Sequence, residues 1–426
     1  MSAPLPKEMN FRDRLESAGV GVRNKLFIQP TNGATFTSSE NFSEFVIPGN
    51  RANTFADLKN LYLRISMTTA IDAIFLDRAG VLNCVERIEC DTSSGVRIFE
   101  TRNKDVIDNL KLYEESDVYS LEGGSRELMG TSSNSTIDGA DAQPGSPERV
   151  ETSSVTNRVF ILPIVNTPIN GFVPMFGNDG IRFRIHWASA LNFVIENTTT
   201  DVAANSFTFT SVRMYYDTVK LSDADMGEML NETDGRFVIT GNAYDNQQET
   251  SVASSLTMNL GFGRTKCKRI YVALRNTAAL ASKVSSSHSF DIHDLNTAEL
   301  RYNGHLINES SLTFTAGNAA VVLAEIVKQS GKSIMGCRNM LSRSTFQTAR
   351  PTVAYNADSG TFHIVFDLTS GADTHLSESG LDTRTGSFQL NLIADSVLAH
   401  NIDVFCEYET KIVLDMRADR VFRVMS

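Results

Sequence analysis

The chain has 426 residues, a formal net charge of −11, and 41% hydrophobic and 21% charged side chains. This length exceeds what a single hydrophobic core usually organises, so we expect two domains. The acidic balance argues against a dedicated nucleic-acid binder, whose surface is normally basic. The 25 phenylalanines and many β-branched residues favour a β-rich fold.

The cysteines and the N-terminal sequence indicate the compartment in which the chain is made. The five cysteines form an odd set without a C-x-x-C pair: Cys84, Cys90, Cys267, Cys337 and Cys406. We therefore expect reduced thiols in a reducing compartment, rather than a disulfide framework or a metal site. The N-terminal sequence lacks the apolar core of a signal peptide, and no long apolar run follows. We expect neither secretion by a standard signal nor a membrane span.

Residues 1–35 are interpreted as an N-terminal arm. Phe11 and Leu15 are four residues apart, a spacing that places both on one face of a short helix. Residues 1–25 carry five basic and three acidic side chains, which is a local excess of positive charge in an acidic chain.

A first β unit is predicted over residues 36–221, because short strand-like runs alternate there with turn residues. Within this unit, apolar residues recur with helical spacing over residues 104–116, so we expect a helix. Residues 122–149 are polar and rich in Gly, Ser and Pro. They predict a long exposed loop that is either mobile or functional in binding.

The acidic segment 222–236 is the best candidate for a linker between two domains. A second β unit is predicted over residues 237–415, with a strong hairpin signal at Asn303-Gly304. A second helix is expected over residues 319–332, in the same relative place as the first helix. Residues 416–426 are interpreted as a C-terminal tail.

Two pairs of similar strands indicate that the chain is a tandem duplication. The tripeptide Tyr216-Asp217-Thr218 is echoed 192 residues later by Tyr408-Glu409-Thr410. Near the start of each unit, Leu61-Tyr62 is matched by Ile270-Tyr271. The sequence therefore predicts an all-β fold of two repeated units, each with roughly eight strands and one short helix.

Two motifs resemble binding sites but are better explained otherwise. Gly331-Lys332-Ser333 looks like the end of a phosphate-binding loop, yet Ile326 stands where that motif needs a glycine. In the run from His288 to Asp294, which also contains Asp291, His288 and His293 are five residues apart. On a strand they would face opposite sides and could not share one metal ion, so we expect exposed polar groups.

No catalytic constellation is recognisable in the sequence. The acidic cluster Glu114, Glu115 and Asp117 is interpreted as a solvated helix end rather than a pair of catalytic carboxylates. Neither a G-x-S-x-G elbow nor an H-E-x-x-H motif occurs. We therefore expect no enzymatic activity, no metal and no cofactor.

Several segments, taken in order, carry a resemblance to a known family. They are ANTFADLKNLYLRISMT, NRVFILPIVNTPINGFVPMFGNDGIRFRIHWAS and FTFTSVRMYYDTVKLSD in the first unit, and KCKRIYVALRN, AELRYNGHLIN, SESGLDTRTGSFQLNL and NIDVFCEYETKIVLDMRADRVFRVMS in the second. Their order over nearly the whole chain resembles the double jelly-roll major capsid proteins. This lineage includes tailless membrane-containing phages, adenovirus hexon, virophages and polinton-like viruses.

The resemblance implies a fold and a function. The fold would be two tandem eight-stranded jelly rolls, each with a short helix in a loop. The chain would be a virion protein, made inside the host cell, that forms pseudo-hexagonal homotrimers tiling an icosahedral shell. Its partners would be neighbouring capsomers and minor capsid and penton proteins, with no sequence-specific nucleic acid.

We hypothesise that both chain ends make assembly contacts with neighbouring tiles, minor capsid proteins, an internal membrane or the genome. The residues proposed for these contacts are Phe11, Arg12, Arg14, Leu15, Arg417, Arg420 and Arg423. The alternative for residues 1–25 is a frayed tail. Two other functions stay open at this point, namely a viral spike or carbohydrate-binding β-sandwich protein, and an enzyme on a β-sandwich scaffold.

Overall fold

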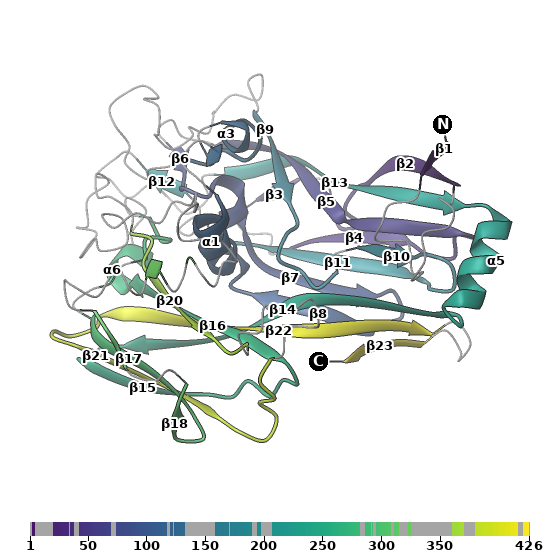
Figure 1. Cartoon of the computed structure of the whole chain (residues 1–426). Helices are drawn as coiled ribbons and strands as arrows, with labels where there is room; N and C mark the ends of the chain where they lie inside the picture. Colours follow the sequence, from purple (N-terminus) through teal and green to yellow (C-terminus); the bar gives the residue numbers. More distant parts are fainter. Residues whose placement is uncertain are drawn as a thin grey trace.

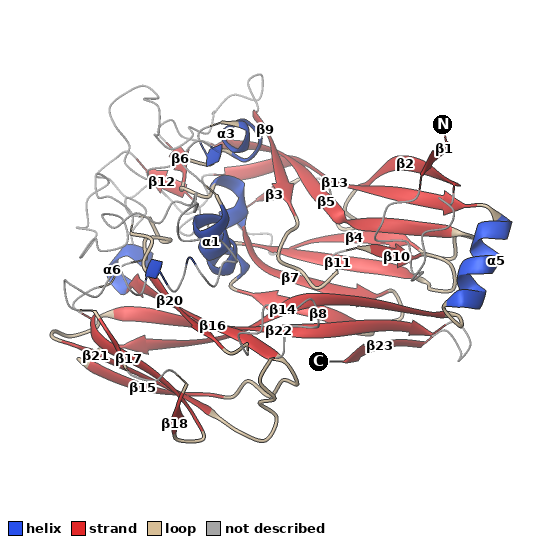
Figure 2. Ribbon diagram, in the orientation of Figure 1, coloured by secondary structure: helices blue, strands red, loops and turns tan. Residues whose placement is uncertain are grey.

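The computed structural model gives the fold of most of the chain. It describes residues 2–4, 20–33, 35–37, 42–69, 74–116, 120–121, 123–132, 158–169, 171–189, 194–196, 207–281, 286–290, 292, 295–307, 311–314, 323–324, 327, 360–369, 380–415 and 421–425. Figures 1 and 2 show two β-sandwiches lying against each other, with a helix between them.

The first sandwich is built from two antiparallel sheets. One sheet has the strand order β2-β13-β5-β10, and the other has the order β4-β11-β7-β8. The bounds are β2 (Val20–Ile28), β4 (Phe42–Pro48), β5 (Thr54–Thr69), β7 (Val85–Thr92), β8 (Arg97–Arg102), β10 (Phe172–Pro174), β11 (Gly180–Trp187) and β13 (Phe207–Leu221). Short strands extend them: β1 (Ser2–Pro4) pairs with β2, β3 (Phe36–Thr37) with β13, and β9 (Arg158–Pro163) with β5, while β6 (Ile74–Leu76) pairs separately with β12 (Val194–Glu196).

The second sandwich repeats this plan. Its sheets have the orders β14-β22-β16-β20 and β15-β21-β17-β18. The bounds are β14 (Arg236–Ser251), β15 (Ser255–Leu260), β16 (Cys267–Asn276), β17 (Leu295–Tyr302), β18 (His305–Leu306), β20 (His363–Asp367), β21 (Phe388–Ala394) and β22 (His400–Asp415). β19 (Leu312–Thr313) pairs with β17, and β23 (Val421–Met425) pairs with β22.

The two strand orders are identical once the eight main strands of each sandwich are numbered along the chain. In both, one sheet places the first, eighth, third and sixth strands side by side, and the other places the second, seventh, fourth and fifth. This order defines a jelly roll. Tyr216 and Tyr408 lie on the two eighth strands, and Tyr62 and Tyr271 on the two third strands. The predicted duplication is therefore confirmed.

Each roll buries its own core between its two sheets. Alternate residues of β11, namely Ile181, Phe183 and Ile185, point into the first core. Leu390 and Leu392 do the same on β21, the seventh strand of the second roll. This alternation is what a period of two residues per strand produces when only one face of a sheet meets the core.

One helix links the two rolls along the chain, and the others lie between strands within each roll. The structure contains α1 (Lys104–Glu115), α3 (Gly124–Met129), α5 (Asp223–Glu232), α6 (Thr277–Leu280) and a short 3-10 helix η2 (Gly80–Cys84). α1 confirms the helix predicted over 104–116. α5 occupies the segment interpreted as a linker, and the Ser222 hydroxyl caps it by accepting a hydrogen bond from the Asp225 amide.

Three sequence-based expectations need correction. β2 pairs with β13, so residues 20–28 belong to the first roll and not to an arm; their exposed charged side chains conceal the strand pattern. α3 lies inside the segment expected to be a loop, where Gly130 adopts the left-handed conformation that ends a helix. β23 adds a strand to β22 within the predicted tail.

Of the second predicted helix, over residues 319–332, the structure describes Leu323, Ala324 and Val327, which are helical. The rest of that helix and the short helix expected around Phe11 and Leu15 lie outside the described residues. The part of the loop 122–149 that follows residue 132 lies outside them as well.

Candidate functional site: the interface between the two rolls

Helix α1 joins the first roll to the second. It follows β8 of the first roll and lies on the outer face of the sheet β14-β22-β16-β20 (Figure 1). Its side chains Val106, Ile107 and Leu110 are fully buried and belong to the same hydrophobic cluster as Phe405 of β22. A helix contributed by one roll therefore completes the packing of the other.

A buried polar network centres on Lys111 of α1. Its ammonium group donates a hydrogen bond of 2.5 Å to the Tyr271 hydroxyl, which donates to Glu407 at 2.8 Å. The same ammonium group lies 3.5 Å from both Glu114 and Glu407. Burial, and then the negative charge of Glu407, raise the pKa of Tyr271 well above its usual value. The phenol thus stays protonated and available as a donor.

Glu114 of α1 is paired with a histidine of the second roll. His363, which is completely buried, lies 3.2 Å from the Glu114 carboxylate. Burial alone would raise the pKa of Glu114, but Lys111 and His363 outweigh it, so the pKa is lowered. Glu114 is therefore a buried anion, and the interpretation of a solvated helix end was wrong for it. Glu115 is exposed as expected, and Asp117 lies outside the described residues.

A second buried histidine bridges two acids of the first roll. His288 is 0% exposed, and its ring nitrogens lie 2.9 Å from Asp105 of α1 and 3.4 Å from Asp77. Burial lowers the pKa of His288, but the hydrogen bonds and charges of the two aspartates outweigh that effect and raise it. The expectation of exposed polar groups was wrong here, because the partners of His288 come from the other roll.

The other residues of that motif cannot be compared with the structure in the same way. Asp291, His293 and Asp294 lie outside the described residues. In the described part of the chain, no three or more His, Cys, Asp or Glu side chains are arranged to hold a metal ion. Gly331-Lys332-Ser333 also lies outside the described residues.

An aromatic cluster joins the rolls at the end of the molecule where α5 lies (Figure 2). The rings of Phe55 and Phe176 from the first roll meet Phe237 of β14 edge-to-face, with centroids 5.8 and 5.7 Å from that of Phe237. Met226 and Met229 of α5 close the cluster. The segment interpreted as a linker is therefore packed against both rolls.

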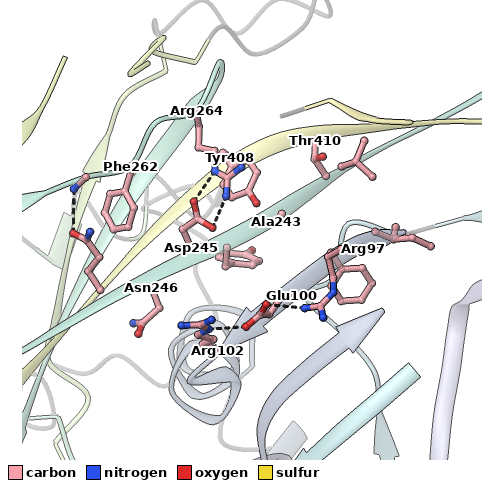
Figure 3. A pocket seen from close by; sticks show the side chains of 16 residues that line it. Arg97, Glu100, Arg102, Ala243, Asp245, Asn246, Phe262, Arg264, Tyr408 and Thr410 are labelled. Atoms are coloured by element: carbon pink, nitrogen blue, oxygen red, sulfur yellow. Dashed lines mark hydrogen bonds and ion pairs between the residues drawn. The ribbon is translucent and has the colours of Figure 1, made fainter. Parts of the chain in front are cut away.

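A cavity of about 440 Å³ lies between β8 of the first roll and β14 of the second (Figure 3). Phe99 and Phe262 form apolar parts of its wall. Arg264 makes two hydrogen bonds, of 2.6 and 2.8 Å, to Asp245, and its guanidinium lies 4.2 Å from the centre of the Tyr408 ring. These contacts fix the wall of the cavity that belongs to the second roll.

The charged groups of this cavity are already matched. Arg97 and Arg102 both bind Glu100, at 2.7 and 2.6 Å, and Arg264 binds Asp245. Arg97 also reaches Glu89, at 2.9 Å. Because every charged lining side chain has an ion-pair partner, the cavity offers no unmatched charge with which to recognise an ionic ligand.

The proposed assembly residues are not brought together by the described part of the chain. Phe11, Arg12, Arg14, Leu15, Arg417 and Arg420 lie outside the described residues. Arg423 is exposed on β23, opposite Val413 of β22. The side chains that join the rolls, above all Lys111, His288 and His363, were not singled out from the sequence as an interface.

The described cysteines fit the expectation of reduced thiols. Cys84, Cys90, Cys267 and Cys406 are free and buried, and Cys337 lies outside the described residues. Burial raises the pKa of the Cys84 thiol. Among the described helices, none is long and apolar enough to cross a membrane.

Comparison with known proteins supports the fold. No protein-family model and no curated protein sequence matches the chain. The structure of the Sputnik virophage superposes with a TM-score of 0.61 at 12% identity, covering 99% of this chain and 92% of that one. The PBCV-1 virus capsid superposes with a TM-score of 0.61 at 9% identity, covering 98% of this chain and 97% of that one. The mavirus major capsid protein superposes with a TM-score of 0.56 at 11% identity, covering 99% of this chain and 93% of that one. The likeness spans both rolls, so the chain has the double jelly-roll fold of these viral capsid proteins.

Proposed function

We propose that this chain is a major capsid protein that forms pseudo-hexagonal homotrimeric capsomers tiling an icosahedral shell. The observation that carries the proposal is the identical strand order of the two rolls, together with the buried interface that fixes one roll against the other. The similar solved structures are capsid proteins or capsids of icosahedral viruses, and they match this chain over nearly its full length.

The repeated fold gives this function a geometric basis. Most homo-oligomers close by rotational symmetry, and three copies of a two-roll chain present six similar units in a ring. Such a ring has a nearly hexagonal outline, which is the shape that tiles a surface without gaps. The chain would act in the virion, and its ends would contact neighbouring capsomers, minor capsid and penton proteins, an internal membrane or the genome.

The polar groups of the interface support a structural role over a catalytic one. The buried acids Asp77, Asp105, Glu114 and Glu407 all have cationic or histidine partners from a neighbouring element. A general acid or base needs access to a substrate. Here the acids are committed to holding the two rolls together.

The oligomeric state of the purified chain tests the proposal. We expect light scattering to give the mass of a trimer and negative-stain images to show particles of hexagonal outline. A monomer that binds glycans in a chelator-sensitive manner would overturn the proposal and favour a spike or carbohydrate-binding protein instead.

A further inference from the structure

A buried lysine lies at the start of helix α1. Lys104 is 1% exposed, and its ammonium group donates hydrogen bonds of 2.9 and 2.8 Å to the two carboxylate oxygens of Asp108, one turn further along the helix. It also donates to the carbonyl oxygen of Val165 at 2.6 Å. Lysine amines act as nucleophiles where an adjacent base removes a proton, and Asp108 stands in the position of such a base.

An asparagine shares the same acid with this lysine. The side-chain amide of Asn166 donates a hydrogen bond of 2.8 Å to Oδ1 of Asp108, the oxygen atom that also accepts from Lys104 at 2.9 Å. The amine of one residue and the amide of another, far apart in the chain, therefore meet at a single oxygen atom. Asn166 has a φ of 52°, in the left-handed region that asparagine enters more readily than most residues other than glycine.

The surroundings of Asp108 favour the exchange of a proton with the lysine. Asp108 is 3% exposed, and burial raises its pKa, an effect that outweighs the opposing charge of Lys104 and the hydrogen bond from Asn166. A raised pKa brings the group closer to its neutral carboxylic form. When one proton passes from the ammonium group to the carboxylate, a neutral amine stands beside a carboxylic acid, and two buried charges disappear.

The amide group borders a cavity of about 460 Å³ between the two rolls. Val165 and Asn166 line this cavity from the first roll, and Gly241 and Asn242 line it from the second. A small molecule released at the amide therefore has space to leave. Lys104, in contrast, is shielded from water by the protein, which keeps its amine close to the acid and the amide.

We propose that Lys104 and Asn166 join in an intramolecular isopeptide bond, with Asp108 as the catalytic acid and base. The lone pair of the neutral Lys104 Nζ attacks Cγ of Asn166. The Nζ–Cγ bond forms and the Cγ–Nδ2 bond breaks, while Asp108 gives its proton to Nδ2 and takes one from Nζ. An amine and a primary amide thus become a secondary amide and a molecule of ammonia. The atoms balance, and the step requires no oxidant or other reactant.

The bond ties together the two ends of the long connection that the first roll makes between β8 and β10. Lys104 begins α1 shortly after β8, and Asn166 follows β9. A covalent link between them closes a ring in the chain and restricts the unfolded state, as a disulfide does. Because α1 packs on the second roll, the link also anchors the first residue of the helix that joins the rolls.

The intact mass of the denatured chain tests for the bond. We expect the wild type to be lighter than its sequence requires by one molecule of ammonia, and Lys104→Met and Asp108→Asn each to abolish this difference. Lys268→Met is the matched control, since it removes another contact between a lysine and an asparagine, in which Lys268 Nζ lies 3.1 Å from Oδ1 of Asn242. It should leave the loss of ammonia unchanged. The wild-type mass is decisive even where a variant fails to fold.

Tryptic peptides locate the loss of ammonia. Trypsin should not cleave after a bonded Lys104, and a branched peptide should join residues 103–111 to residues 159–182. Cyclisation of an asparagine before a glycine, as at Asn303-Gly304, also releases ammonia but gives no branch. A wild-type chain of full mass, or one without the branched peptide, would overturn the proposal and leave a hydrogen-bond network of structural role. The proposed capsid function is independent of this result, because it is judged by the oligomeric state.

Discussion

Lys111 and Tyr271, which are 160 positions apart in the chain, form a hydrogen bond of 2.5 Å that joins a helix of the first roll to the third strand of the second. The bond exists only when both rolls are folded and docked. Because the same ammonium group also faces Glu114 and Glu407, it is the central cation of the interface.

Removal of this cation should destabilise the whole chain. Lys111→Met keeps most of the side-chain length but leaves Glu407 buried without its ammonium partner. Breaking a buried ion pair from one side costs about 3–5 kcal/mol. We expect a loss of that size in the free energy of unfolding, measured by urea denaturation. Lys220→Met, at an exposed position on β13, is the control and should change it by less than about 0.5 kcal/mol.

The stability of the interface should depend on the protonation of His288. Its pKa is raised above the ordinary value of 6.5, because Asp105 and Asp77 outweigh the effect of burial. The stabilisation is therefore complete below pH 6.5 and is lost as the pH rises through the raised pKa. We expect the melting temperature of the wild type to exceed that of His288→Asn most at acidic pH, with a gap that narrows on alkalinisation.

His186 should give a pH dependence of stability opposite to that of His288. Burial lowers its pKa despite the nearby Glu89 carboxylate. A histidine whose pKa is lowered in the folded state contributes stability at pH values above its ordinary pKa. That stability is lost as the pH falls through the lowered pKa. The gap between the wild type and His186→Asn should therefore widen with rising pH. Parallel pH trends for the two variants would refute the assignment for His288.

Close backbone packing between the rolls should make Gly241 intolerant of a side chain. A Cβ at this position on β14 would lie 2.1 Å from the carbonyl oxygen of Pro168, a backbone atom of the first roll. We expect Gly241→Ala to destabilise the chain by at least about 1–3 kcal/mol, the usual cost of overpacking. Gly263→Ala should be nearly neutral, since no atom lies within 4 Å of its Cβ. Equal melting temperatures for the two variants would contradict this contact.

Helix α5 offers a stabilising substitution. Gly227 lies in the middle of this helix, and a Cβ there would meet nothing within 4 Å. Because glycine is less favourable than alanine in a helix by about 0.8–1.0 kcal/mol, Gly227→Ala should raise the melting temperature. A decrease, measured by calorimetry, would show that the helix packs more tightly at this point than the structure indicates.

The duplication was predictable from the sequence because it leaves similar short patterns of residues in both halves of the chain. The tyrosines of the third and eighth strands recur with their neighbours, and strand and helix periodicities follow from short windows. β2 was missed for a local reason as well. The exposed residues Arg23 and Lys25 interrupt its apolar pattern, and the pairing with β13 that satisfies its backbone lies almost 200 residues away.

The interface could not be predicted in the same way. His288 was judged by its spacing from His293, but its protonation and burial are decided by Asp77 and Asp105, which are 211 and 183 positions away. Glu114 looked like a solvated acid because the sequence does not show that Lys111, on the same helix, is buried. It also does not show that His363 lies beside Glu114 in the folded chain. Burial of charge is a tertiary property, and only the docking of the two rolls reveals it.

The strand β22 takes part in both cores. Its first half, including Val404 and Cys406, packs in the second roll, whereas Ile412 belongs to the core cluster of the first. At about 3.4 Å per residue, this 16-residue strand is roughly 50 Å long and passes through both rolls. The two rolls of one chain therefore cannot rotate relative to each other about a hinge without breaking this strand. Any curvature in a larger array must arise from the tilt between separate chains.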